Sequence, residues 1–134
     1  MIVWIQRHDF QYEELPAATA GEAVAAFEAF DWASEIRKSA ESGEEACPPG
    51  FGVVTDEGLI LHLVPRDSGE CMMHFHYPRK RRFLLLFSGH VRETVTREGV
   101  DRETCLLLIE SMFLEDREQL MAIMLEIAGE DGTA

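Results

Sequence analysis

The pattern of hydrophobic and polar positions divides the chain into a helical front part, a strand-rich middle and two closing helices. β-Branched and aromatic residues near the start predict a strand within residues 1–10. Helix formers dominate residues 19–42 and predict a helical segment there. Short apolar runs separated by brief turns predict an antiparallel meander over 51–96. Two amphipathic helices are predicted over 101–128.

Capping residues mark the ends of these predicted helices. Thr19, with Glu22 three residues later, forms a capping box, and the apolar stripe changes face near Asp31, which predicts a kink or restart. Asp101 and Asp116 precede the two C-terminal helices as N-caps. We expect Gly129 to end the last helix and the remaining residues, 130–134, to form a frayed tail.

These elements predict a single α+β domain that spans residues 1–134. It contains an antiparallel sheet of about four to six strands, an N-terminal helical segment and two C-terminal helices packed on one face. The two-residue period of a strand separates a core face from a mixed, half-exposed face. The core face is predicted to carry Leu59, Leu61, Leu63, Cys71, Met73, Phe75 and Tyr77, and the other face Ile60, His62, Met72, His74 and His76.

The histidines of the mixed face are the main candidates for metal ligands. His74 and His76 share one side of a strand, and His62 on the neighbouring strand could join them. The His-x-His pattern is similar to the metal-binding motif of cupin barrels, but Arg79 and Lys80 stand where that motif needs a carboxylate. We therefore expect no metal and no cofactor, and we keep a histidine-based metal site as an alternative.

The chain carries 25 acidic and 12 basic side chains, which gives a formal net charge of −13. Residues 1–50 contribute −7, residues 51–92 contribute +2 and residues 93–134 contribute −8, so the acidity belongs to the helices. A negative surface disfavours binding to nucleic acid or to an anionic membrane and favours a basic protein partner. The basic stretch Arg79–Arg82 is predicted to be a solvated hairpin turn.

No catalytic motif is present, so the sequence favours a non-enzymatic protein. It contains no Gly-x-Ser-x-Gly, Walker A loop, dinucleotide fingerprint or Cys-x-x-Cys. Three widely spaced cysteines are typical of the reducing cytoplasm rather than of a disulfide framework. No apolar run reaches the ~20 residues of a membrane helix, and the N-terminus lacks the pattern of a signal peptide. We expect a cytoplasmic location.

The helices supply the candidate contacts with a partner. The acids we single out lie on the first helical segment and around the last two helices, and an apolar arc on the last helix is wider than one core contact requires. That wide arc equally favours a homodimer. The predicted contact residues are Glu28, Glu35, Glu110, Glu115, Glu118, Met121 and Leu125.

Two groups of small acidic bacterial proteins share this gross character. In size and charge the chain resembles the immunity proteins that neutralise bacterial toxins, which implies inhibition of a basic toxin. It also resembles the type III secretion chaperones, which are acidic and end in an amphipathic helix. The chaperones begin with a helix and interrupt their strands with another, whereas here a strand comes first and the meander is continuous. The immunity-type inhibitor is therefore the leading hypothesis, with a self-associating domain and a chaperone-like binder as alternatives.

Overall fold

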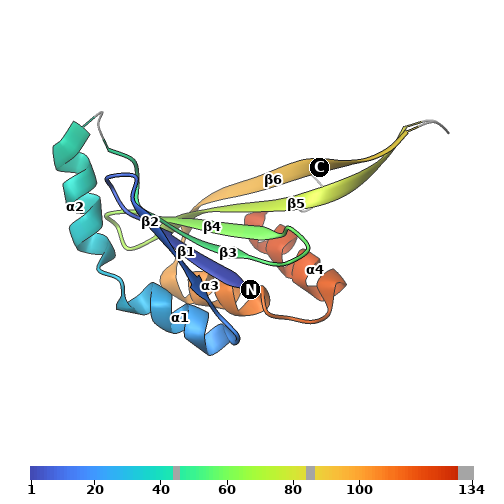
Figure 1. Cartoon of the computed structure of the whole chain (residues 1–134), viewed down its shortest axis with the longest axis horizontal. Helices are drawn as coiled ribbons and strands as arrows, with labels where there is room; N and C mark the ends of the chain where they lie inside the picture. The colour runs from blue at the N-terminus through green and yellow to red at the C-terminus, as the bar shows by residue number, and fades with distance from the viewer. Residues whose placement is uncertain (44–45, 84–86, 130–134) are drawn as a thin grey trace.

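The computed structural model describes residues 1–43, 46–83 and 87–129, with the backbone alone described over 79–83 and 87–92. Within these ranges the chain forms six strands and four helices, shown in Figure 1. The strands form one sheet in the order β2-β1-β3-β4-β5-β6, and all neighbouring strands are antiparallel. The bounds are β1 Ile2–Gln6, β2 Tyr12–Pro16, α1 Ala20–Ala29, α2 Trp32–Ser42, β3 Gly50–Val54, β4 Ile60–Pro65, β5 Cys71–Phe83, β6 Phe87–Val100, α3 Arg102–Ser111 and α4 Arg117–Ala128.

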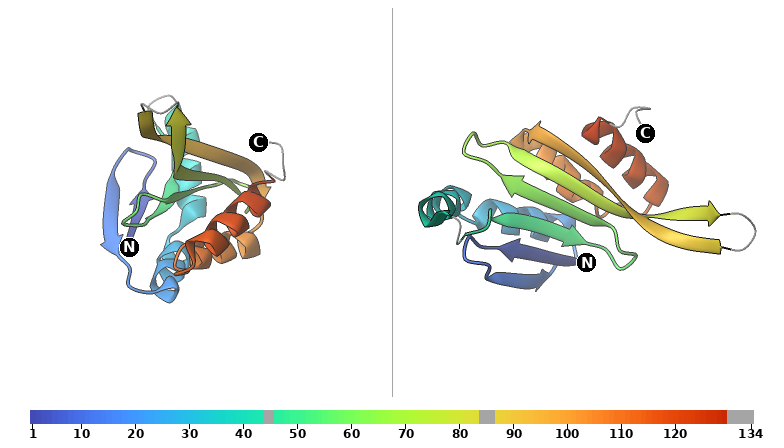
Figure 2. Two further views of the ribbon diagram at one scale, coloured as in Figure 1. Left: turned by 90° about the vertical axis from the view of Figure 1, so that its right-hand side faces the viewer. Right: turned by 90° about the horizontal axis from the view of Figure 1, so that it is seen from above.

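The α+β class and the antiparallel sheet are confirmed, but the placement of the helices differs in part from the prediction. α1, α3 and α4 cover one face of the sheet, whereas α2 stands at one end of it (Figure 2). α3 packs against α1, α4 and β4, and α4 packs against β6. The prediction treated the two front helices as one segment, because helical periodicity does not report how a restarted helix turns away from the sheet.

The core lies between the sheet and these three helices. Every predicted core-face position of β4 and β5 is buried or, for Tyr77, partly buried, which confirms the strand periodicity. Helical spacing predicts a buried stripe of Cys105, Leu108, Ile109 and Met112 along α3 and its C-cap, and all four side chains are fully buried. The largest fully buried side chains are Phe51, Phe75, Leu61, Leu63, Met73, Leu108, Ile109, Met112, Leu120 and Met124.

The three predicted helix N-caps are confirmed at Thr19, Asp101 and Asp116, and Asp31, near which a kink or restart was predicted, caps α2. Each side chain accepts a hydrogen bond from the backbone N–H three residues later, which satisfies a donor that the first turn leaves open. Gly129 ends α4 in the left-handed region with φ 77°. The predicted frayed tail, 130–134, lies outside the described residues.

Two strands, not one, precede the first helix, which corrects the expected order of elements. The predicted first strand ends at Gln6, and a second strand, β2, follows after a short turn. All five residues of β2 are exposed, because it is the edge of the sheet and only β1 pairs with it. A strand without a buried face leaves no alternating apolar signal in the sequence.

The basic stretch Arg79–Arg82 lies in strand β5 and not in a turn, so that prediction is wrong. β5 pairs with β6 in continuous register from Tyr77↔Glu93 to Phe83↔Phe87. β4 begins opposite His76, so the part of β5 that follows His76 has a neighbouring strand on one side only. A strand tolerates a proline such as Pro78 at an unpaired edge of this kind. We call this extension, 78–83 with 87–92, the arm. It projects beyond the rest of the sheet (Figures 1 and 2).

Candidate functional site

The exposed surface of α3, α4 and the turn between them carries most of the predicted contact residues. Glu110, Glu115 and Glu118 are all exposed, and none of them forms an ion pair with a residue that the structure describes. Asp116 between them is engaged in capping α4. The three glutamates therefore present uncompensated negative charge to solvent.

The two arginines of α3 and α4 do not neutralise these glutamates, because each arginine binds an acid from another part of the chain. Arg102, the first residue of α3, pairs with Glu28 of α1. Arg117, the first residue of α4, holds Glu57 of the β3–β4 turn through two nitrogens, and its Nη2 lies 2.9 Å from Glu57 Oε1. These two ion pairs fasten α3 and α4 to their neighbours and leave the acids of α3 and α4 without counter-charges of their own.

Apolar side chains are also accessible on the same two helices. Leu107 of α3 is 49% exposed, whereas Leu106 is partly buried and Leu108 is fully buried. Met121 and Leu125 of α4 are half-buried and pack against the edge of the core. The wide apolar arc of α4 thus divides into a buried side, with Leu120 and Met124, and a half-exposed flank. We call the set Leu107, Glu110, Glu115, Glu118, Met121 and Leu125 the acidic helical face.

The two predicted contact acids of the front helices occupy different environments. Glu28 is exposed but is already paired with Arg102. Glu35 is only 3% exposed. Its carboxylate oxygens both lie 3.2 Å from His8 Nδ1, and Lys38 Nζ lies 3.6 Å away. Glu35 joins α2 to the turn between β1 and β2, which is a structural role within the chain.

The predicted histidines lie together on the sheet face that no described helix covers. His62 and His74 face each other across β4 and β5, with ring centroids 5.5 Å apart, and His76 stacks on His74 at 6.2 Å. The Nδ1 atoms of His74 and His76 are hydrogen-bonded at 2.8 Å to Thr96 and Thr94 of β6. Among the described residues, no group of three His, Cys, Asp or Glu side chains has the arrangement that holds a metal ion.

Burial makes His62 a neutral residue. Desolvation, followed by repulsion from His74 and His76, lowers the pKa of His62 to about 4. Desolvation also lowers the pKa of His74. At neutral pH His62 and His74 can therefore stack on aromatic groups and exchange hydrogen bonds, and they do not supply positive charge.

Sequence reasoning missed that Trp4 extends the row formed by His62, His74 and His76. Its indole ring lies over Gly52 of β3 and 5.1 Å from the His62 ring, so Trp4, Gly52, His62 and His74 follow one another across four strands. The available signal was Gly50-Phe51-Gly52, since glycines in a strand interior often mark a close approach by another group.

Comparison with known proteins finds no relative of this chain. No family model, no curated protein and no solved structure matches the chain. No helix formed by the described residues has both the length and the apolar character needed to cross a bilayer.

Proposed function

We propose that this chain is a non-enzymatic interaction protein whose acidic helical face binds a basic protein partner. The observation that carries the proposal is the separation of charges in residues 101–128. This segment has seven acids and two arginines, and both arginines are used by Glu28 and Glu57, which lie outside it. Five glutamates, Glu103, Glu110, Glu115, Glu118 and Glu126, have no ion pair with any part of the chain that the structure describes.

The arrangement of this face supports a binding role through two complementary effects. Glutamates on a helix surface raise the rate at which a basic protein arrives, because like charges concentrated on one side steer the encounter. Leu107, Met121 and Leu125 belong to the same two helices and offer apolar area that a partner can cover. Apolar anchors surrounded by charges are the usual distribution of affinity in a specific interface, and methionine adapts to the shape of its partner.

Among basic partners, we favour a toxin that the chain inhibits in the manner of an immunity protein. An inhibitor of this kind must cover a cationic surface tightly, which an acidic face with apolar anchors can do. Strands β3 to β6 also follow one another without a helical interruption, unlike the element order of the secretion chaperones.

The test is a comparison of two double variants with the same change in net charge. Glu110→Lys with Glu118→Lys reverses the charge of the acidic helical face. Glu14→Lys with Glu70→Lys reverses two exposed acids, in β2 and in the β4–β5 turn. Each purified protein is immobilised and exposed to an extract of the native host at low and at high salt.

We expect wild type and the Glu14/Glu70 variant to recover the same basic protein, more at low salt than at high salt. The Glu110/Glu118 variant should recover about tenfold less of it, a change of about 1.4 kcal/mol in binding. Recovery of no specific basic protein, or equal recovery by both variants, would contradict the proposal.

A second candidate function is self-association, favoured by the projecting arm. Arg79, Lys80, Arg81 and Arg82 belong to the arm, while the helices on the body of the molecule are acidic. The arm of one copy could therefore reach the acidic helical face of another. Light scattering at low salt decides this, because a strict monomer at micromolar concentration would remove self-association as a function.

A further inference from the structure

A cavity lies where α2 meets the sheet, away from the acidic helical face. It has a volume of about 480 Å³ and is formed by the end of α1, the first turns of α2, the β4–β5 turn and the start of α3. This volume is within the range of pockets that hold small organic molecules. We call it the α2 pocket.

The floor of the α2 pocket is apolar and rigid. Phe27, Trp32, Ile36, Pro65 and Cys71 supply it from α1, α2, β4 and β5. Trp32 is held in place, since its indole Nε1 donates a 2.8 Å hydrogen bond to the backbone oxygen of Phe27 and its ring contacts that of Phe27 at 5.6 Å. An apolar ligand would therefore meet a preformed surface and would order few side chains on binding.

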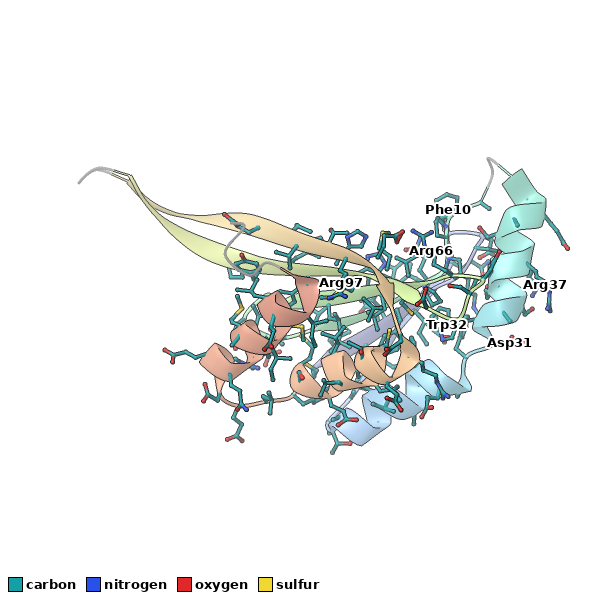
Figure 3. The ribbon with its side chains drawn as sticks, turned by 180° about the vertical axis from the view of Figure 1, so that it is seen from behind. Phe10, Asp31, Trp32, Arg37, Arg66 and Arg97 are labelled. Atoms are coloured by element: carbon teal, nitrogen blue, oxygen red, sulfur yellow. The ribbon has the colours of Figure 1, made fainter. Side chains whose placement is uncertain are left out.

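The rim of the α2 pocket gathers positive charge in a chain that has little of it. Three of the 12 basic residues, Arg37, Arg66 and Arg102, line this one pocket. Figure 3 shows Trp32, Arg37 and Arg66 at the same end of the molecule, whereas Arg97 lies beside α4. The lining acids are Glu28 and Asp67.

The ion pairs of the rim leave one guanidinium available. Arg102 is bound to Glu28, and Arg66 Nη2 lies 3.2 Å from Glu98 Oε1. Arg37 is exposed and has no ion pair with any described residue. A guanidinium binds a carboxylate through two parallel hydrogen bonds, which gives both affinity and orientation.

We infer that the α2 pocket binds a small amphipathic carboxylate, with the apolar body on the Trp32 floor and the carboxylate on Arg37. A cationic ligand is disfavoured because Arg37 carries a positive charge that no described acid neutralises, and a neutral apolar ligand would leave Arg37 without a partner. Asp67 is the one lining acid that no arginine of the described chain holds, and it opposes a second negative charge on the ligand.

Three probes that share a ten-carbon chain test this inference by calorimetric titration: decanoate, decanol and decyltrimethylammonium. We expect wild type to bind decanoate about tenfold more tightly than decanol, and to bind the cation more weakly still, because a charge-assisted hydrogen bond contributes about 1.5–3 kcal/mol. Equal binding of decanoate and decanol, or no binding of decanoate, would overturn the inference.

Three substitutions in α2 locate the site. Arg37→Gln should weaken decanoate binding about tenfold and leave decanol unchanged. Lys38→Gln removes the same charge at the next residue, outside the lining, and should leave decanoate binding intact. Ala33→Trp places a large ring in the pocket from an exposed position and should abolish binding of both probes without unfolding the protein. Equal effects of Arg37→Gln and Lys38→Gln would refute the assignment.

Discussion

At the scale of single residues, the buried carboxylate of Glu35 has the largest expected effect on stability among the charged groups of α2. It is 3% exposed and contacts His8, Lys38 and Arg7. Glu35→Ala leaves these groups without their common partner, so we expect the free energy of unfolding to fall by about 2 kcal/mol. Glu35→Gln keeps a polar atom beside His8 and should lose about half as much.

Urea denaturation measures both variants. Glu41→Ala is the matched control, because Glu41 is exposed on the same helix and has no ion pair with a described residue. Its effect should stay within about 0.5 kcal/mol. A loss in Glu35→Ala no larger than that of the control would show that the contacts around Glu35 do not contribute to stability.

His62 makes the stability depend on pH in a defined window. Its pKa is about 4 in the folded chain and 6.5 in a model peptide, so the unfolded chain takes up a proton first as the pH falls. The stability linked to His62 is therefore complete above pH 6.5 and is lost progressively as the pH falls towards 4. Because the ring is not fully buried, solvent screening limits this loss to about 1–2 kcal/mol.

Comparing the pH dependence of stability in wild type and in His62→Phe isolates the contribution of His62. Phenylalanine keeps a ring beside Trp4 but cannot be protonated. Thermal melts at intervals between pH 7.5 and 4 should show a smaller decline in the variant. Parallel declines would mean that His62 does not titrate differently in the folded and unfolded chains.

The difference between Glu28 and Glu35 shows what sequence reasoning could recover for single side chains. Sequence patterns identified the helical segment to which both acids belong, and the cap at Thr19 followed from local chemistry within four residues. The environment of Glu35 depends on His8, 27 residues earlier, which lies at the turn between β1 and β2. Local patterns carry no information about such contacts, so both acids appeared equally available to a partner.

At the scale of elements, the packing of β1 on β3 depends on a glycine. A Cβ at Gly52 would collide with the indole ring of Trp4. We expect Gly52→Ala to destabilise the protein by about 2 kcal/mol, since the ring must move off a well-packed sheet. In a Trp4→Ala background the same substitution should be nearly neutral, with a coupling energy of at least about 1 kcal/mol.

Chemical denaturation of the two single variants and the double variant measures that coupling. Gly21→Ala in α1 provides the opposite case, because the nearest atom to its new Cβ, Thr19 Oγ1, is 3.8 Å away. It should stabilise the protein by about 0.5–1 kcal/mol. Additive effects of Gly52→Ala and Trp4→Ala would show that the ring does not restrict this position.

The elements that the sequence predicted and those that it missed differ in how they meet the core. β4, α3 and the buried positions of β5 each bury one regular face, so hydrophobic periodicity identified them. β2 buries no residue, and the arm continues a strand past Pro78 into a run of cations. Both depend on backbone pairing with a partner strand, which leaves no mark on the hydrophobic pattern.

At the scale of the whole molecule, folding separates the charges that the sequence already grouped by segment. The acidic helices lie on the body of the molecule, and the basic stretch of β5 lies on the arm. The ion pairs that the structure describes on α3 and α4 lead outwards to Glu28 and Glu57. Repulsion among the acids of α3 and α4 is therefore balanced by packing against the rest of the chain and not by pairing within these two helices.

This arrangement predicts that salt stabilises the protein. With a net charge of −13, mutual repulsion opposes the compact state, and salt at about 0.15 M screens charges more than about 8 Å apart. We expect the thermal midpoint to rise by a few degrees when sodium chloride is increased from about 0.01 to 0.15 M. Circular dichroism at a series of salt concentrations measures this shift.

Neutral substitutions separate repelling acids from paired ones. Glu110→Gln with Glu118→Gln should raise the low-salt midpoint and reduce the effect of salt, because both glutamates lack a counter-charge among the described residues. Glu28→Gln breaks the pair with Arg102 and should not raise it. A lower midpoint in the Glu110/Glu118 variant would mean that these acids stabilise the free chain. A higher midpoint would mean that the free chain retains acids that weaken it, as a surface specialised for a basic partner does.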